Sequence, residues 1–395
     1  NLAFLPMHYS GLAGMPRRVW TYPESLGVGT ANMISSVGAF VFAAGILIIV
    51  WDVLRPRGKE PYAKRNPWNA GTLEWLVEMP GESWGVRSIP AVTSRYPIWE
   101  QPNFIDDVDN GRFYLPDAAE MKRETIITSV LDGKPLQCLR VPGPSFMPMI
   151  AAVFTGAVFI FATFHWWAAT IVATGLSTSS ILVWLWRGTA VIPEKPEKDV
   201  GLGLKLPLYM SGPHSVGWWA MFIMMMGDAT AFLGLVFGYY YFFTIHADFP
   251  PPATVGPGVL WPSVAFGLFA VTWATALGAR LSNQAGRVDR ARVFMAAGAL
   301  VALVASAALL WGPYVTGLRP TAHVYPATVW VITIWTAAHG VAGSLMLGYC
   351  LARSLAGRMT PAHDIDIFNV ALYWHFVGLT VSITVGTLAY LPVLT

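Results

Sequence analysis

The sequence has 395 residues, of which 55 % are hydrophobic and 12 % are charged, and its formal net charge is +3. The small positive charge belongs mostly to loops between apolar segments, so it gives no argument for nucleic-acid binding. The apolar runs are long enough to cross a bilayer, which takes about 20 helical residues for roughly 30 Å of hydrocarbon. The composition therefore predicts an all-α integral membrane protein and excludes a water-soluble one.

One expected membrane span precedes a long polar segment, and seven follow it. Within these spans the only formally charged side chain is that of Asp228. Three blocks result: residues 1–52 with a loop and one helix, a linker over 53–145, and a seven-helix block over 146–395. The expected spans are 30–51, 146–165, 167–186, 215–243, 259–279, 293–313, 324–352 and 368–392.

The basic residues predict how the chain is oriented. Alternating spans place 53–145, 187–214, 280–292 and 353–367 on one side, with 12, 4, 4 and 2 Lys or Arg residues respectively. Only three of the 25 basic residues lie on the other side. By the positive-inside rule the cation-rich side is cytoplasmic, so both ends of this segment are expected outside.

The first block carries an arginine pair on the side where cations are scarce. Arg17 and Arg18 lie in the run GLAGMPRRVWTYP (11–23), where Gly14 and Pro16 predict an irregular backbone outside the helix. A guanidinium is always charged, and its forked donors match carboxylates bidentately. The pair could anchor lipid phosphates or hold two carboxylate groups of a cofactor or partner. The strong charge bias favours the second interpretation.

The linker carries eleven prolines, which argues against long helices and for an extended segment with many turns. Its tryptophans indicate that it packs against something, because disordered linkers are poor in aromatic residues. The two cysteines of the chain, Cys138 in the linker and Cys350 at a helix end, predict neither a disulfide nor a metal site. The tryptophans of the linker are Trp68, Trp75, Trp84 and Trp99.

Small residues in the seven-helix block predict close helix contacts. Gly234 and Gly238 are four residues apart, and Gly340 is followed by Gly343. Such spacing lets helix backbones approach closely inside a membrane. The alanine-rich run 293–308 is interpreted in the same way.

Asp228 is the first candidate for chemistry in this block. A carboxylate deep in a span is costly to ionise, so such residues face a polar interior and mark either function or a structural hydrogen bond. We expect desolvation to favour the neutral acid. The sequence leaves the structural and the functional interpretation open.

Two of the eight histidines, His339 and His375, lie well inside spans on different helices. Imidazole is a common ligand of transition metals, so a metal site has to be considered. No third nitrogen, thiolate or carboxylate stands at helix spacing beside them, which favours hydrogen-bonded packing histidines over a metal site.

The motifs together resemble a known family. The first block resembles the last helix and tail of cytochrome c oxidase subunit I, and the seven-helix block resembles subunit III of the same enzyme. Their order resembles that of bacterial oxidases in which the two subunits are fused. The motifs of the first part are GLAGMPRRVWTYP (11–23), Ser35-Ser36-Val37-Gly38, Asn66-Pro67-Trp68 and Leu73-Glu74-Trp75. Those of the second are MMMGDATAFLGLVFGYYYFF (224–243), AHGVAG (338–343) and LYWHFVG (372–378).

This resemblance implies a role for each motif. Arg17 and Arg18 would hydrogen-bond and neutralise haem propionates near the outer surface. Asp228 stands where subunit III usually has Glu, an acid that supports proton delivery or subunit integrity. The segment with Trp374 and His375 would serve helix packing and lipid contact, as would His339, and no metal would be bound.

The sequence departs from the family at two further positions. Gly378 stands where Asp is common, and Ala342 stands where a second His is common. Both departures weaken a polar network at that end of the block.

The resemblance predicts part of a terminal oxidase of the bacterial inner membrane, which passes electrons from cytochrome c to O2 and pumps protons. Haem and copper would be carried by the preceding part of subunit I and by subunit II, so this segment alone would be inactive. The chain begins at Asn1 without an initiator Met, as expected for the later part of a longer protein. Phospholipids are further expected partners. The alternatives are a proton-coupled transporter and a purely structural assembly subunit.

Overall fold

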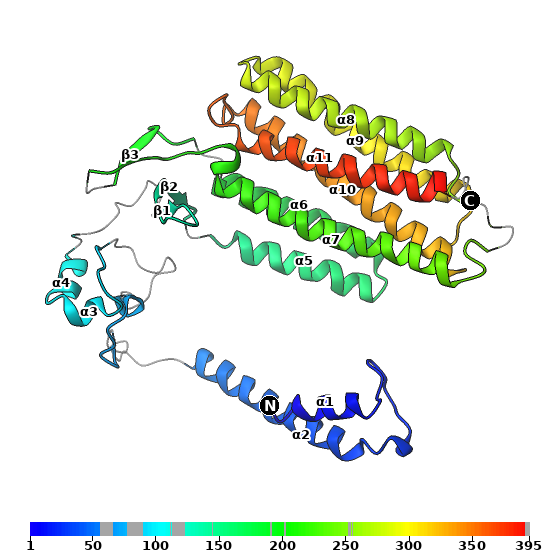
Figure 1. Cartoon of the computed structure of the whole chain (residues 1–395), viewed down its shortest axis with the longest axis horizontal. Helices are drawn as coiled ribbons and strands as arrows, with labels where there is room; N and C mark the ends of the chain where they lie inside the picture. Colours follow the sequence, from blue (N-terminus) through cyan, green and yellow to red (C-terminus); the bar gives the residue numbers. More distant parts are fainter. Residues whose placement is uncertain are drawn as a thin grey trace. The chain divides into compact units, whose positions relative to one another are not determined.

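Long helices account for most of the chain in the computed structural model (Figure 1). The structure describes residues 1–55, 66–76, 90–110, 112, 123–143, 145–189, 192–200, 203–251, 254 and 256–391. It divides into two compact units, Asn1–Val86 with Val92–Ile105, and Arg87–Ala91 with Asp106–Thr395. Trp84 and several linker prolines lie outside the described residues.

The first unit contains a long apolar helix with a shorter helix packed on it. Helix α1 spans Leu5–Leu12, and α2 spans Gly29–Leu54. Gly38 of α2 allows the close contact, because a Cβ there would lie 2.5 Å from the backbone nitrogen of Ala3. The shorter elements of this region are η1 (Glu24–Leu26), η2 (Leu73–Leu76), α3 (Pro97–Glu100) and, at the boundary with the second unit, α4 (Phe104–Asp109).

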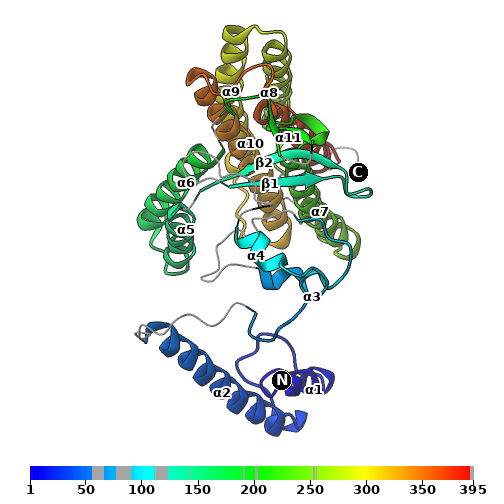
Figure 2. The ribbon, with the colours of Figure 1, turned by 90° about the vertical axis from the view of Figure 1, so that its left-hand side faces the viewer.

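The second unit contains a bundle of helices in which α8 and α9 form one antiparallel pair and α5 and α6 form another (Figures 1 and 2). A π-helical turn, Gly386–Tyr390, extends the last helix. The helices are α5 (Met147–Thr163), α6 (Trp167–Thr189), α7 (Val216–Ile245), α8 (Leu260–Gln284), α9 (Val288–Val315), α10 (Val324–Leu355) and α11 (Ile365–Val385), with the short η4 (Gly212–His214) before α7.

Two small antiparallel hairpins lie at one end of this bundle, as Figures 1 and 2 show. Strand β1 (Arg123–Thr128) pairs with β2 (Pro135–Val141), with Glu124 opposite Arg140 and Ile126 opposite Cys138. Strand β3 (Glu197–Asp199) pairs with β4 (Lys205–Pro207). The linker proline pattern correctly excluded long helices in its described part, but it did not reveal the β1–β2 hairpin.

Within the described ranges, seven helices are long and apolar enough to cross a membrane. They coincide with seven of the eight expected spans, so the prediction of an all-α integral membrane protein is confirmed. The remaining expected span, 146–165, corresponds to α5, which has 17 residues. At 1.5 Å per residue it reaches about 25 Å, somewhat less than the bilayer core. It ends early because the chain turns at His165, whose φ is +58°.

The glycine prediction is confirmed for one helix and wrong for another. A Cβ on Gly340 would lie 2.4 Å from Ser306 Oγ, and one on Gly343 would lie 2.6 Å from the Trp374 ring. A Cβ on Gly234 or Gly238 would meet nothing within 4 Å. These two glycines of α7 therefore mark no close contact in this chain, because sequence spacing does not say which helix face is covered.

Candidate functional site

The arginine pair lies in the loop between α1 and α2 of the first unit. Both side chains are exposed, and no carboxylate in the described part of the chain pairs with either. The expected irregular backbone is present, since φ is +97° at Gly14 and +60° at Arg18. A positive φ is uncommon for a residue with a side chain, and it sets the direction in which the Arg18 side chain projects from the loop.

The loop that carries the pair is fastened to both helices beside it. Ser10 Oγ on α1 donates to Asn32 Oδ1 on α2 at 2.9 Å, and Asn32 Nδ2 lies 3.4 Å from the sulfur of Met15. Two forked donors that have no acid partner among the described residues, on an anchored loop at the end of an apolar helix, fit a ligand with anionic groups.

Asp228 on α7 lies beside His339 on α10, with 3.6 Å between Asp228 Oδ2 and His339 Nε2. The Asp228 side chain is 38 % exposed on this chain, so the bundle does not enclose it, whereas the His339 side chain is 17 % exposed. The partner of Asp228 could not be predicted from the sequence.

The surroundings of His339 fix the hydrogen on its ring. His339 Nδ1 lies 2.8 Å from the carbonyl oxygen of Trp335, which can only accept, so Nδ1 carries a hydrogen. The ring stacks on the Trp335 indole with centroids 3.7 Å apart, and the Tyr373 hydroxyl donates to the His339 carbonyl at 3.1 Å. The Nε2 atom then faces Asp228 either with a lone pair or with a second hydrogen.

This arrangement can hold a proton between the two side chains. A carboxylate that faces a lone pair is repelled, whereas one proton on either partner converts the contact into attraction. The pair thus combines an acid and a base on two neighbouring apolar helices. In the described residues no group of three His, Cys, Asp or Glu side chains is placed to bind a metal ion.

The other predicted residues of the block, Trp374 and His375, make contacts of their own with residues outside this pair. Trp374 is fully buried and packs against Gly343, so it is a packing residue of the bundle core. His375 is exposed and its Nδ1 accepts from Trp273 Nε1 at 3.1 Å. A Cβ on Gly378 would lie 2.9 Å from the Trp273 ring, so the missing side chain at that position makes room for the indole.

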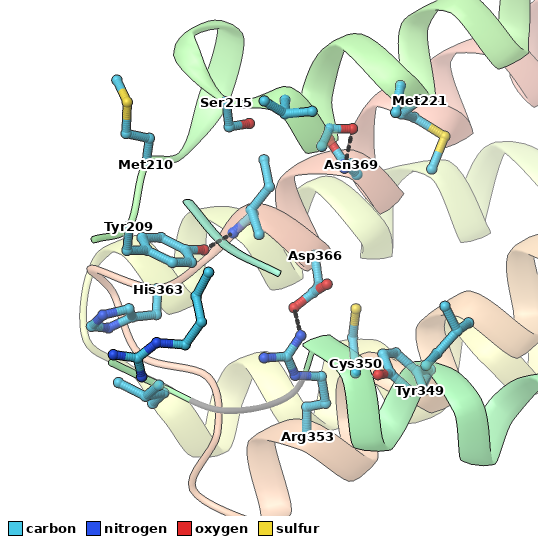
Figure 3. A pocket seen from close by; sticks show the side chains of 18 of the residues that line it. Tyr209, Met210, Ser215, Met221, Tyr349, Cys350, Arg353, His363, Asp366 and Asn369 are labelled. Atoms are coloured by element: carbon cyan, nitrogen blue, oxygen red, sulfur yellow. Dashed lines mark hydrogen bonds and ion pairs between the residues drawn. The ribbon is translucent and has the colours of Figure 1, made fainter. Parts of the chain in front are cut away.

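A cavity of about 660 Å³ opens between α6, α7, α10 and α11 at the end of the bundle that carries the hairpins (Figure 3). Its wall is largely apolar, and its polar end holds the buried Arg353, which pairs with Asp366. In the described structure the buried atoms Arg353 Nε and Asn369 Oδ1 have no hydrogen-bond partner. The apolar wall includes Leu182, Met221, Leu345, Met346 and Val370.

The cavity was not predicted from the sequence. Arg353 stands in the last turn of α10 and Asp366 in the first turn of α11, so two opposite charges at adjacent helix ends were the available signal. Tyr209, in the connection before α7, accepts from the Ile365 backbone nitrogen at 2.8 Å and ties this connection to α11. Burial raises the pKa of the Tyr209 hydroxyl, which stays neutral.

Comparison with known proteins finds relatives in one class of membrane complex. The chain is 27 % identical over 189 residues to cytochrome c oxidase subunit 1 of Bacillus subtilis. The matched segment covers 47 % of this chain and 27 % of that protein. It is 37 % identical over 100 residues to the subunit 1 of Alkalihalophilus pseudofirmus, covering 25 % and 16 % respectively. A probable quinol oxidase subunit 1 of Staphylococcus aureus is 36 % identical over 124 residues, covering 29 % and 17 %.

The chain thus spans about a quarter or less of the length of these relatives. No protein-family model matches it. Each named relative is a subunit 1 of an oxidase, and the long apolar helices of this chain fit a membrane complex of that class. The chain is therefore a multi-pass membrane protein that is related, over part of its length, to subunit 1 of bacterial haem–copper oxidases.

Proposed function

We propose that this chain is part of a terminal respiratory oxidase, consisting of the last helix and tail of subunit I followed by a subunit III-type bundle. The observation that carries the proposal is the partial identity with subunit 1 of bacterial oxidases, together with the Arg17–Arg18 pair ahead of α2. The complete complex would transfer electrons from cytochrome c to O2 with proton pumping. It would lie in the bacterial inner membrane, with the linker in the cytoplasm.

Arg17 and Arg18 would hold the two propionates of haem. Their side chains are exposed and lack carboxylate partners among the described residues, which suits an anionic ligand from outside this chain. Haem and copper, carried by the rest of subunit I and by subunit II, would supply the redox chemistry of the complex. The contribution of this chain would be fixed positive charge and orientation at the propionates.

Asp228 and His339 would support proton uptake. Their side chains share a contact that is attractive only when it holds a proton, and both belong to apolar helices. The pair would accept a proton and pass it on without a metal, while Trp335 and Tyr373 keep the imidazole in place. A structural role of the same pair would join α7 to α10.

The cavity between α6 and the helices α7, α10 and α11 would hold a phospholipid. Its apolar wall suits acyl chains. Arg353 Nε at its polar end, which has no hydrogen-bond partner within the described ranges, suits a phosphate oxygen. The bundle would in this way add lipid-mediated stability to the oxidase.

The test is purification of the complete complex from membranes through a tag on this chain. A visible spectrum with haem bands that change on reduction, together with O2 consumption driven by reduced cytochrome c, is the expected result. The quinol-oxidase relative makes a quinol donor the control substrate. A complex that lacks haem bands would contradict the oxidase proposal and favour a transporter. If the complex keeps full O2 turnover after removal of residues 146–395, this block has only a structural role in assembly.

A further inference from the structure

The β1–β2 hairpin, at the end of the linker, forms one wall of the cavity. Gln137 and Leu139 lie on one face of β2, and both line the cavity. Leu208, in the connection that follows β4, lines it as well, and Gln137 Nε2 donates to the Leu208 carbonyl at 3.2 Å. The hairpin therefore covers apolar space between the helices although it belongs to a polar segment of the sequence.

A buried charge holds the hairpin in place, and Arg140, which pairs with this charge, lines the cavity as well. The carboxylate of Glu124 on β1 has no exposed surface, and it is paired with Arg140 at 3.2 Å and with Lys198 of β3. Arg140 also reaches Glu194 at 3.3 Å. One buried carboxylate thus pairs with two cations from two different hairpins, and Cys138 Sγ lies 3.6 Å from it.

A small apolar core accompanies this charge cluster. Cys138 of β2 packs with Leu206 and Leu208, and all three are buried. Burial, and secondly the charge of Glu124, raise the pKa of the Cys138 thiol to about 11, so it is neutral and protected from electrophiles at pH 7. The hairpins are therefore held together both by apolar packing and by ion pairs.

We propose that the β1–β2 hairpin is a latched cover over the cavity, and that the Glu124 carboxylate is the latch. With Glu124 in place the hairpin closes the cavity end that carries Arg353. Without its charge, Arg140 keeps its contact with the exposed Glu194, but the ion pair between Lys198 and the hairpin is lost, and the hairpin separates from β3–β4. Exchange of an amphiphile between the cavity and the aqueous phase would then depend on this latch. The inference concerns the wall of the cavity and does not rest on the oxidase proposal.

The two cysteines of the chain provide the test. Cys138 of β2 is buried between the two hairpins, and Cys350 on α10 lines the cavity with 1 % of its surface exposed. Membranes that contain the chain are treated with N-ethylmaleimide, and modification of each cysteine is followed by peptide mass spectrometry. Glu124→Gln should accelerate modification of both by about tenfold or more, because a buried ion pair that loses one partner is strongly destabilised.

Cys350 is the decisive reporter, because it does not contact Glu124 and its modification requires access to the cavity. The matched control is Asp289→Asn, which removes a solvent-exposed ion pair with Arg292 and should leave both rates unchanged. Faster modification of Cys138 alone would show a loosened hairpin that does not cover the cavity, and would overturn the proposal. Unchanged rates at both cysteines would overturn it too.

A second variant and one wild-type measurement guard against a Glu124→Gln chain that fails to fold. Lys198→Met removes one of the two cations and should accelerate modification of Cys350 less than Glu124→Gln does. A modification rate equal to that of the wild type would count against the latch. In the wild type, amide hydrogen exchange over 135–141 should be slower than in the turn 129–134 that joins the strands. Equally fast exchange in both would mean that the hairpin is not fastened.

Discussion

The Nε2 atom of His339 lies 3.6 Å from the Oδ2 atom of Asp228, and the carbonyl of Trp335 holds the other ring nitrogen in its protonated form. This relationship brings an acid and an imidazole that are far apart in the sequence together between helices α7 and α10. It gives the acid of α7 a partner without any metal.

Asp228→Asn is expected to slow proton-coupled turnover, because the asparagine amide cannot take up and release a proton opposite His339 Nε2. We expect a loss of roughly two- to tenfold, since a typical hydrogen bond contributes about 0.5–1.5 kcal/mol. Turnover of the purified complex, measured as O2 consumption and as proton release, checks this. Asp248→Asn, on the exposed end of the same region, is the control. Unchanged turnover and unchanged subunit content would leave Asp228 without a role.

If Arg18 holds a haem propionate as proposed, Arg18→Lys is expected to lower the midpoint potential of that haem in the complete complex. Lysine keeps the charge but loses the fork that binds a propionate through two hydrogen bonds. A shift of roughly 60 mV corresponds to 1.4 kcal/mol for one electron, about the contribution of one charge-assisted hydrogen bond. Redox titration of the haem bands measures it. Arg319→Lys, at the only other arginine expected on this side, should leave the potential as it is.

Gly340→Ala is expected to destabilise the bundle. The added methyl group would lie 2.4 Å from Ser306 Oγ and 2.6 Å from the Phe269 ring, so α9 or α8 has to move away from α10. Overpacking of this kind costs about 1–3 kcal/mol. Thermal unfolding in detergent measures it, and Gly348→Ala on the same helix is the control because nothing lies within 4 Å of the added carbon. A lower transition temperature for both variants alike would contradict the packing argument.

The connection between α10 and α11 should lose stability in mild acid because of His363. Burial lowers the pKa of this imidazole below its ordinary 6.5, the charge of Arg353 lowers it further, and Asp364 opposes the shift. The folded chain then binds fewer protons than the unfolded chain in the window just below pH 6.5, so stability is full above this pH and falls as the pH drops. Unfolding temperatures between pH 7 and pH 5 check the direction. In His363→Asn, whose amide can still reach Thr360, this part of the pH dependence should disappear.

Much of the membrane architecture could be predicted from the sequence. Whether a helix crosses a bilayer depends on the polarity of about 20 consecutive residues, which is a local property. The spans from α6 to α11 and the isolated α2 were therefore located to within about five residues, and the end of α8 and the start of α9 differ most from the prediction. The length of α5 was overestimated, because the turn at His165 depends on a backbone conformation that composition does not reveal.

The candidate site was only partly predictable. Arg17, Arg18 and Asp228 stood out because charges are rare in their surroundings. The partner of Asp228 could not be named, since an acid in a span can face any of several helices. The roles of the glycines were equally undecided: Gly340 and Gly343 meet Ser306 and Trp374, while Gly234 meets no neighbour.

The sequence by itself determined that this chain is a multi-pass membrane protein with two arginines ahead of its first span, because hydropathy and charge act residue by residue along the chain. Only the tertiary structure decided that His339 faces Asp228, that the linker hairpin lines a cavity, and that Glu124 pairs with cations of both hairpins. These relationships join residues from separate helices and hairpins, and inside a bilayer such contacts depend on the packing of shapes, which no hydrophobic pattern encodes.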